Sequence, residues 1–179
     1  MLMFAQREDV GAVGAMLYYP DKTIRNAGIC LGMDGTTGSF FQYVKKNSIG
    51  YMGRLLYAQN VSAVTSACML LRRDVWEKVG GLDKAWAIAF NDVDLCLRIR
   101  KAGYLIVWTP FAELIHYGSR NIRVEDSTQK KKYFESEIRL FRSRWSKELE
   151  AGDPYFNPNF SLDRHDFFVK PNVQQYDAR

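Results

Sequence analysis

The segment from Trp86 to Tyr104, WAIAFNDVDLCLRIRKAGY, has two aspartates at the start of an amphipathic pattern, Asp92 and Asp94. Carboxylates in the first turn of a helix are stabilised by the helix dipole and by free backbone N–H groups, so both are candidates for helix capping. A carboxylate at a helix N-terminus that faces a cleft also suits a general base, which takes a proton from a hydroxyl group. A metal site is the third alternative. Asp94 and Arg98 have helical i,i+4 spacing, so we expect them to pair, which leaves Asp92 as the free carboxylate.

His116 is the second candidate for chemistry, and it ends a short apolar segment. A single histidine is more often structural than a ligand, and it forms a metal site only with partners. The segment after it contains Ser119, Arg120 and Arg123. Because arginine forks suit phosphate oxygens, this segment is either a phosphate site or an ordinary solvated loop.

The sequence between these candidates has two further features of interest. GGLD, at residues 80–83, fits a helix stop followed by a turn, and Trp86 follows it in an apolar segment. The indole of Trp86 either belongs to the core or forms a platform for a sugar ring at the edge of a cleft.

Apolar runs and turn signals predict the elements that must position these residues. From the N-terminus we expect a helix end at residues 1–7, a central buried strand at 10–19 and a second short strand at 24–31. A long loop at 36–60 and an apolar strand at 62–73 follow. Two helices and two strands follow, at residues 75–79, 91–103, 104–110 and 112–116. Asp74 caps the first of these helices, Asn91 or Asp92 caps the second, and glycines end both. Pro110 is expected to close the first of the two strands.

The period of the pattern changes after Asp126. Apolar side chains recur at helical spacing, at Phe134, Ile138, Phe141 and Trp145. We therefore expect a long amphipathic helix over 126–149 that packs through an aromatic stripe, followed by an extended tail pinned by aromatic residues. The expected fold is α/β, with a mixed sheet and flanking helices in residues 1–125, and with a helical extension and aromatic tail, residues 126–179, packed on it.

Composition excludes several classes of protein. A hydrophobic content of 47% with 14% aromatics predicts a folded domain, and the sequence has no apolar run long enough for a transmembrane helix. Cys30, Cys68 and Cys96 are scattered and odd in number, which indicates buried free thiols in a reducing compartment and argues against zinc. We expect a cytoplasmic location, including the inner face of the membrane. The net charge of +5 fits solvated helix faces, and without a recognisable motif we expect no nucleic-acid partner.

Four linked motifs occur in order between Val61 and His116. The first two are a small-residue strand, VTSACMLLRR, and a helix with its turn, DVWEKVGGLD. The other two are a helix that begins with carboxylates, FNDVDLCLRIRKAG, and a strand pair that ends in histidine, YLIVWTPFAELIH. In order and spacing they resemble the C-terminal half of the family 2 glycosyltransferases, inverting enzymes of the GT-A fold. VGAVGAMLYYPDKTIRNAG resembles the segment before these motifs in many bacterial members, and the GDPYFNPNFSL tail resembles endings of bacterial polysaccharide-type members. The resemblance implies a partial GT-A-type sheet and a role in polysaccharide biosynthesis at the cell envelope.

On the acceptor side, the resemblance implies a role for several residues. Asp92 falls on the catalytic base that deprotonates the acceptor hydroxyl. Asn91, Trp86 and Asp83 fall on the acceptor side of the site. Lys84 stands where the family usually has an acid, a departure that concerns the acceptor and leaves the assignment of the base intact.

On the donor side, His116 falls on the histidine that helps to hold a divalent metal, Mn²⁺ or Mg²⁺, and the donor diphosphate. Ser119 and Arg120 lie in the loop expected near that diphosphate. The implied reaction transfers a sugar from a nucleotide-sugar to a glycan or polysaccharide acceptor, by one displacement with inversion.

The family's nucleotide-binding strands and its DxD metal motif belong to the N-terminal half. The DVD of residues 92–94 opens a helix in the acceptor half, so it is not interpreted as that motif. We expect the chain to be the acceptor-binding and catalytic-base half of the enzyme, inactive and without bound metal by itself, with the missing half as partner. A sheet edge left exposed by the absence of the other half would promote self-association. The alternative is a non-catalytic carbohydrate-binding or assembly module with the same fold.

Overall fold

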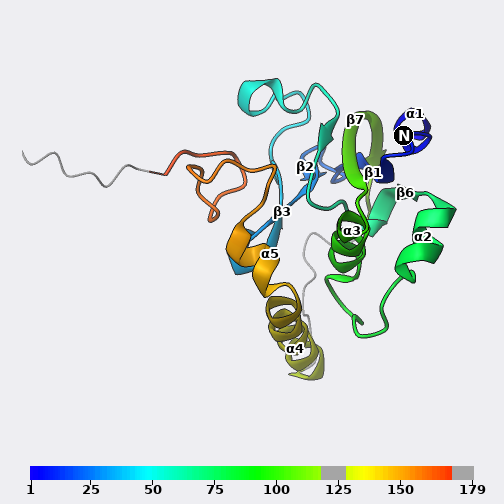
Figure 1. Cartoon of the computed structure of the whole chain (residues 1–179). Helices are drawn as coiled ribbons and strands as arrows, with labels where there is room; N and C mark the ends of the chain where they lie inside the picture. The colour runs from blue at the N-terminus through cyan, green and yellow to red at the C-terminus, as the bar shows by residue number, and fades with distance from the viewer. Residues whose placement is uncertain (118–127, 171–179) are drawn as a thin grey trace, which may run out of the picture.

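The computed structural model describes residues 1–117 and 128–170, and a mixed sheet with flanking helices forms its centre (Figure 1). The five strands of this sheet are β1 (Val10–Tyr18), β2 (Ile24–Asn26), β5 (Gln59–Asn60), β6 (Met69–Leu71) and β7 (Leu105–Ile115). Strand β1 is central, because it pairs antiparallel with β2 and β6 and parallel with β7. Strand β5 pairs antiparallel with the other side of β7. The expected α/β class and the central position of β1 are confirmed.

The described helices follow most of the expected boundaries. They are α1 (Leu2–Ala5), α2 (Arg73–Val79), α3 (Asn91–Lys101), α4 (Thr128–Arg144) and α5 (Ser146–Ala151). Short 3-10 turns occur at η1 (Met33–Gly35), η2 (Tyr51–Gly53) and η3 (Ser66–Cys68). Helix α2 ends at Gly80, whose φ of 79° is the left-handed conformation that glycine favours at a helix end. The single long helix expected over 126–149 is wrong, because the helix breaks at Trp145 into α4 and α5.

Two strand predictions in the first half of the chain are wrong. The segment 24–31 is not one strand, because Gly28 turns the chain with a φ of 96°. Strand β2 then joins the main sheet, whereas β3 (Ile29–Leu31) forms a separate hairpin with β4 (Thr37–Ser39). The apolar run 62–73 contains only the short strand β6, because η3 occupies its middle.

Strand β7 also differs from the prediction, because it continues through Pro110. Its register with β1 shifts from the Ala15–Thr109 pair to the Met16–Glu113 pair. Pro110 falls within this irregularity, where its missing N–H group removes no hydrogen bond from the ladder. The two short strands expected here are therefore one long strand, and it carries the chain to His116.

Helix α3 packs on β1 and runs in the opposite direction. At the start of β1, Gly11 lies so close to the end of α3 that a Cβ atom on it would be 2.4 Å from Cγ2 of Ile99. Further along β1, Gly14 contacts Val64, whose carbonyl oxygen is 3.7 Å from Sγ of Cys96. The N-terminus of α3 therefore lies toward the carboxyl ends of β1 and β7, the usual place for ligand sites in α/β sheets.

The aromatic stripe and the tail share the core of the sheet domain. Phe141 and Trp145 are buried, and Phe134 and Ile138 pack against the same cluster. In the tail, Phe156, Phe160 and Phe167 are also buried. The expected stripe and the aromatic anchoring of the tail are both confirmed.

The three cysteines are free thiols, but they differ in exposure. Cys30 and Cys96 are buried, and burial raises the pKa of the Cys96 thiol to about 12. Burial likewise raises the pKa of Cys30 far above the ordinary range of a thiol. Cys68 is partly exposed, so the expectation that all three are buried is wrong for this residue. Its place at the end of η3, outside a continuous strand, explains the difference.

Candidate functional site

The first turn of α3 carries both aspartates in a tightly specified conformation. The Asn91 side chain accepts a hydrogen bond from the Asp92 N–H at 2.7 Å, and Asp92 Oδ1 accepts one from the Val93 N–H at 2.9 Å. The residue at the N-cap position is Phe90, with a φ of 62°, so the cap expected at Asn91 or Asp92 is wrong, as is the one expected at Asp74, because Arg72 holds that position in α2. A bulky residue in the left-handed region is strained, and such strain persists only where the surroundings hold it. Here the Phe90 ring stacks on Phe141, with ring centroids 4.6 Å apart.

A pocket of about 420 Å³ opens beside this turn. Its walls come from the start of α3, the loop before it, the β3–β4 hairpin, η3 and α4, and the lining residues are Ile29, Thr36, Thr37, Ser66, Ile88, Ala89, Phe90, Asn91, Asp92, Val93 and Phe134. Hydroxyl, amide and carboxylate groups therefore face a partly apolar surface. This mixture suits a hydroxyl-rich ligand that is bound through a few oriented polar groups.

Asp92 is held in this wall by two segments of the chain. Its Oδ2 accepts the Ser66 N–H at 3.0 Å and the Ser66 hydroxyl at 3.5 Å, while Oδ1 is held by Val93. A carboxylate oxygen has more than one acceptor direction, so these bonds leave capacity for a further donor. Asp92 can therefore accept a hydrogen bond, and a proton, from a hydroxyl group in the pocket.

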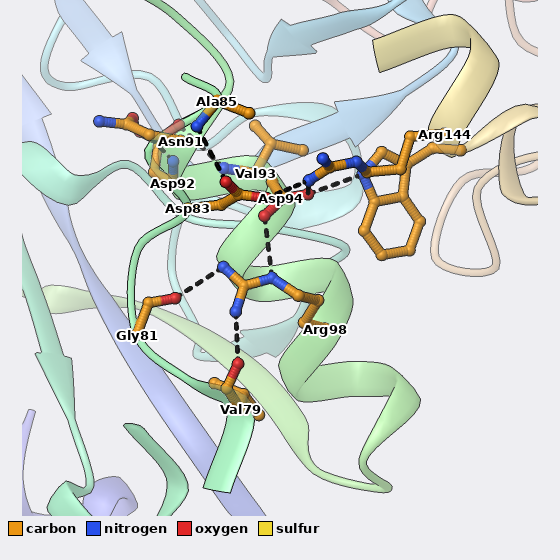
Figure 2. A network of polar contacts seen from close by, with 11 residues as sticks. Val79, Gly81, Asp83, Ala85, Asn91, Asp92, Val93, Asp94, Arg98 and Arg144 are labelled. Atoms are coloured by element: carbon orange, nitrogen blue, oxygen red, sulfur yellow. Dashed lines mark hydrogen bonds and ion pairs between the residues drawn. The ribbon is translucent and has the colours of Figure 1, made fainter. Parts of the chain in front are cut away.

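Asp94 is not among the residues that line the pocket, and its fully buried side chain lies in a polar network (Figure 2). Its Oδ2 accepts the Nε–H of Arg98 at 2.9 Å, as expected from the i,i+4 spacing. Its Oδ1 accepts hydrogen bonds from Arg144 and from the indole N–H of Trp145, both at 3.1 Å. The Asp94–Arg98 pair is confirmed, and the network adds two partners from the end of α4 that local spacing does not predict.

The two arginines extend this network to the turn before the pocket. Arg98 donates to the carbonyl oxygens of Val79 at 2.6 Å and Gly81 at 2.7 Å, which ties the end of α2 to α3 (Figure 2). Arg144 also donates to Asp83 Oδ2 at 2.6 Å. The network thus fixes the position of α3 relative to α2 and α4.

Asp83 belongs to this network. Its other oxygen accepts the Ala85 N–H at 2.8 Å. That hydrogen bond and the Arg144 guanidinium lower the pKa of Asp83 below its ordinary value. Asp83 therefore orders the 83–85 turn, and its predicted place on the acceptor side stays a prediction.

Trp86 is only 6% exposed and lies in the core. Its ring packs edge-on against Phe90 and Phe141, and the Arg144 guanidinium lies 5.0 Å from the ring centroid. Trp86 is therefore a core residue and not a sugar-binding platform at the edge of a cleft. The ring offers no open face to a sugar, so any contribution of Trp86 to acceptor binding is indirect.

His116 follows β7, and its backbone N–H donates to the Tyr18 carbonyl at 2.8 Å. In the part of the chain that the structure describes, the lining of the Asp92 pocket includes Asn91 and Asp92 but not His116. Ser119 and Arg120, predicted to lie near a diphosphate, are outside the described residues. The structure therefore places Asn91 and Asp92 in the lining of one pocket, and the acceptor-side and donor-side roles of all these residues stay predictions.

The described side chains do not form a complete metal site. Within residues 1–117 and 128–170, no three His, Cys, Asp or Glu side chains converge in a way that could hold a metal ion. Mn²⁺ and Mg²⁺ need several oxygen or nitrogen ligands, which one imidazole cannot supply. The same two stretches contain no helix with the length and apolar character of a membrane span.

Sequence reasoning missed Ser66 and the hairpin residues Thr36 and Thr37. Ser66 lies in an apolar run that predicts a strand, and the two threonines lie in a segment that predicts a loop. One local signal was available, because Thr and Ser hydroxyls favour local turns, and in the structure the Thr65 hydroxyl accepts the Ala67 N–H.

Comparison with known proteins places these features in a family context. The family model described as "Glycosyltransferase like family 2" matches residues 1–147. The uncharacterized protein y4gI of Sinorhizobium fredii (strain NBRC 101917 / NGR234) is 44% identical over 170 residues, which are 94% of this chain and 19% of that protein. The O-antigen biosynthesis protein RfbC of Myxococcus xanthus is 36% identical over 160 residues, 88% of this chain and 12% of that protein.

A third relative is named for a sugar transfer. The N-acetylglucosaminyl-diphospho-decaprenol L-rhamnosyltransferase of Mycobacterium tuberculosis (strain CDC 1551 / Oshkosh) is 31% identical over 114 residues, 60% of this chain and 37% of that protein. No solved structure matches the chain. The chain thus spans only 19% and 12% of the lengths of the first two relatives.

Proposed function

This chain belongs to glycosyltransferase family 2, and on that premise we propose that it is the acceptor-binding and catalytic-base part of an inverting transferase. The donor is a nucleotide-sugar, and the acceptor is a glycan or polysaccharide. The observation that carries this proposal is Asp92, held by Ser66 and Val93 in the wall of a pocket lined with polar groups. The names of two relatives, one for O-antigen biosynthesis and one for an L-rhamnosyltransferase, support a role in bacterial polysaccharide synthesis.

The geometry supports the following chemistry for this chain's own residues. An acceptor hydroxyl in the pocket donates a hydrogen bond to Asp92 and transfers its proton to that carboxylate as its oxygen attacks the anomeric carbon of the donor. The bond from that carbon to the diphosphate oxygen breaks on the opposite face, which inverts the configuration. The backbone N–H groups of Ser66 and Val93 keep the carboxylate from rotating away from the hydroxyl.

Other pocket residues bind and orient the acceptor in this proposal. Thr36, Thr37 and Asn91 supply hydroxyl and amide groups to the remaining acceptor hydroxyls. The apolar side chains of Ile88 and Phe134 exclude water from the same space. His116, Ser119 and Arg120 belong to the donor side, an assignment supported by the family resemblance.

Donor binding tests whether this chain alone can bind the nucleotide-sugar. Because the resemblance places the nucleotide-binding strands and the DxD motif in an N-terminal half, we expect this chain alone to bind nucleotide-sugars weakly or not at all. Calorimetric titration of the chain with UDP-, dTDP- and GDP-sugars in the presence of Mn²⁺ should show no micromolar binding. The full-length enzyme under the same buffer is the positive control. Micromolar binding by the chain alone would show that these residues suffice for the donor and would contradict this part of the proposal.

A further inference from the structure

Glu137 on α4 is a buried carboxylate that accepts hydrogen bonds from three successive backbone N–H groups. Its Oε1 accepts those of Ala87 at 2.7 Å and Ile88 at 3.0 Å, and its Oε2 accepts that of Ala89 at 2.7 Å. The residue is 4% exposed. Hydrogen bonds to a carboxylate are stronger than those between neutral groups, and a buried carboxylate without such partners would be strongly unfavourable.

The segment held by Glu137 contributes to one wall of the pocket that contains Asp92. Ile88 and Ala89 line the pocket together with Asp92, and Ala89 is followed directly by the strained N-cap residue Phe90. Phe90 is in turn stacked on Phe141, which lies one helical turn after Glu137 on the same face of α4. A polar clamp and an aromatic clamp from one helix therefore hold the backbone that leads into the first turn of α3.

The backbone N–H groups of Ala87, Ile88 and Ala89 need an acceptor, and an apolar side chain at position 137 would leave all three without one. A carboxylate that accepts from three successive N–H groups therefore also constrains the path of the backbone that carries them. All three donors come from the pocket loop, so the constraint acts on that loop.

We infer that Glu137 is a positioning residue for the acceptor pocket. Its carboxylate sets the path of Ala87–Ala89, and through Phe90 it sets the orientation in which Asp92 meets the Ser66 N–H. Glu137 acts through this backbone and contacts none of the reacting groups. The inference rests on the proposed function of the pocket, but its structural content can be measured without any substrate.

The test is amide hydrogen exchange by NMR in this chain, with the variant Glu137→Gln. A glutamine has one carbonyl oxygen, so its NH₂ group must face at least one of the three N–H donors. We expect exchange at Ala87–Ala89 to accelerate by about tenfold or more. We expect the Ser66 amide, which donates to Asp92, to accelerate as well, by a factor of at least about three. If Glu137 only stabilised the Ala87–Ala89 segment, the exchange rate of the Ser66 amide would not change.

Two matched controls separate positioning from general destabilisation. Glu135→Gln changes the same residue type on the same helix at an exposed position and should leave all four amides unchanged. Asp153→Asn alters another buried carboxylate that accepts backbone N–H groups, those of Leu31 and Tyr155, outside the pocket. It should accelerate exchange at Leu31 and Tyr155 only. If Glu137→Gln does not fold, Glu137→Asp keeps the charge with a shorter reach and should give smaller accelerations at the same four amides.

The outcomes are distinct. Unchanged exchange at Ser66, with or without faster exchange at Ala87–Ala89, overturns the inference, and so does equal acceleration at Ser66 in Asp153→Asn. Acceleration at Ala87–Ala89 and Ser66 that is confined to the Glu137 variants supports it. The proposed function fails separately, if the Asp92 variant described below keeps its turnover, and that result leaves the exchange data unaffected.

Discussion

Replacing Asp92 with Asn in the full-length enzyme is expected to reduce the turnover of sugar transfer by at least about a hundredfold. Asparagine has nearly the same shape, and its one carbonyl oxygen can keep the hydrogen bond from the N–H of either Ser66 or Val93, but it cannot take a proton from the acceptor hydroxyl. Binding of the donor, measured by calorimetry, should change little, because Asp92 lies on the acceptor side of the proposed site. The turnover is measured under saturating donor, with release of the nucleotide as the signal.

The matched control for this variant is Asp74→Asn. Asp74 is also an aspartate in the first turn of a helix, but it lies in α2, is 61% exposed and pairs with Arg72. Its replacement should leave turnover unchanged. Turnover retained by Asp92→Asn would refute the assignment of the base, whatever the control shows.

Replacing Asp94 with Ala is expected to give the largest loss of stability. The change would leave Arg98, Arg144 and the Trp145 indole N–H without their shared acceptor in a fully buried position. Breaking a buried ion pair from one side costs about 3–5 kcal/mol of unfolding free energy. The two guanidinium groups are 24% and 32% exposed and can gain some hydration, so we expect a loss of about 3 kcal/mol, at the lower end of that range.

Urea denaturation followed by tryptophan fluorescence measures this loss. Glu77→Ala is the control, because the Glu77–Arg73 pair has the same i,i+4 spacing but is 62% and 91% exposed. Exposed pairs of this kind contribute at most about 0.5 kcal/mol. If the two variants lost similar amounts of unfolding free energy, the buried Asp94 network would contribute no more to stability than an exposed ion pair.

The comparison of sequence and structure shows which features local patterns can predict. The Asp94–Arg98 pair, the end of α2 at Gly80 and the buried strand β1 were predictable, because each depends on residues a few positions apart. Arg144 and Glu137 were not, because they reach the site from a helix about fifty residues further along the chain. Helical spacing places Glu137 beside Phe134 and Phe141, but it does not identify the backbone N–H groups of Ala87–Ala89 as its partners.

The pocket itself was predictable only in part. The resemblance indicated Asn91 and Asp92, and the structure places both in the lining. The opposite walls come from the β3–β4 hairpin and from η3, within segments interpreted as a strand or a loop. Trp86 shows the converse case: an aromatic residue beside a site can equally support it from the core, and only its burial distinguishes the two.

The most direct measurement is a structure of the full-length enzyme with its glycan acceptor bound. The account predicts that the hydroxyl which receives the sugar lies within about 3.2 Å of a carboxylate oxygen of Asp92, in the pocket bounded by Ser66 and the Ala87–Ala89 segment. A receiving hydroxyl bound beyond hydrogen-bonding distance of Asp92, and in contact with a different base, would contradict the central claim.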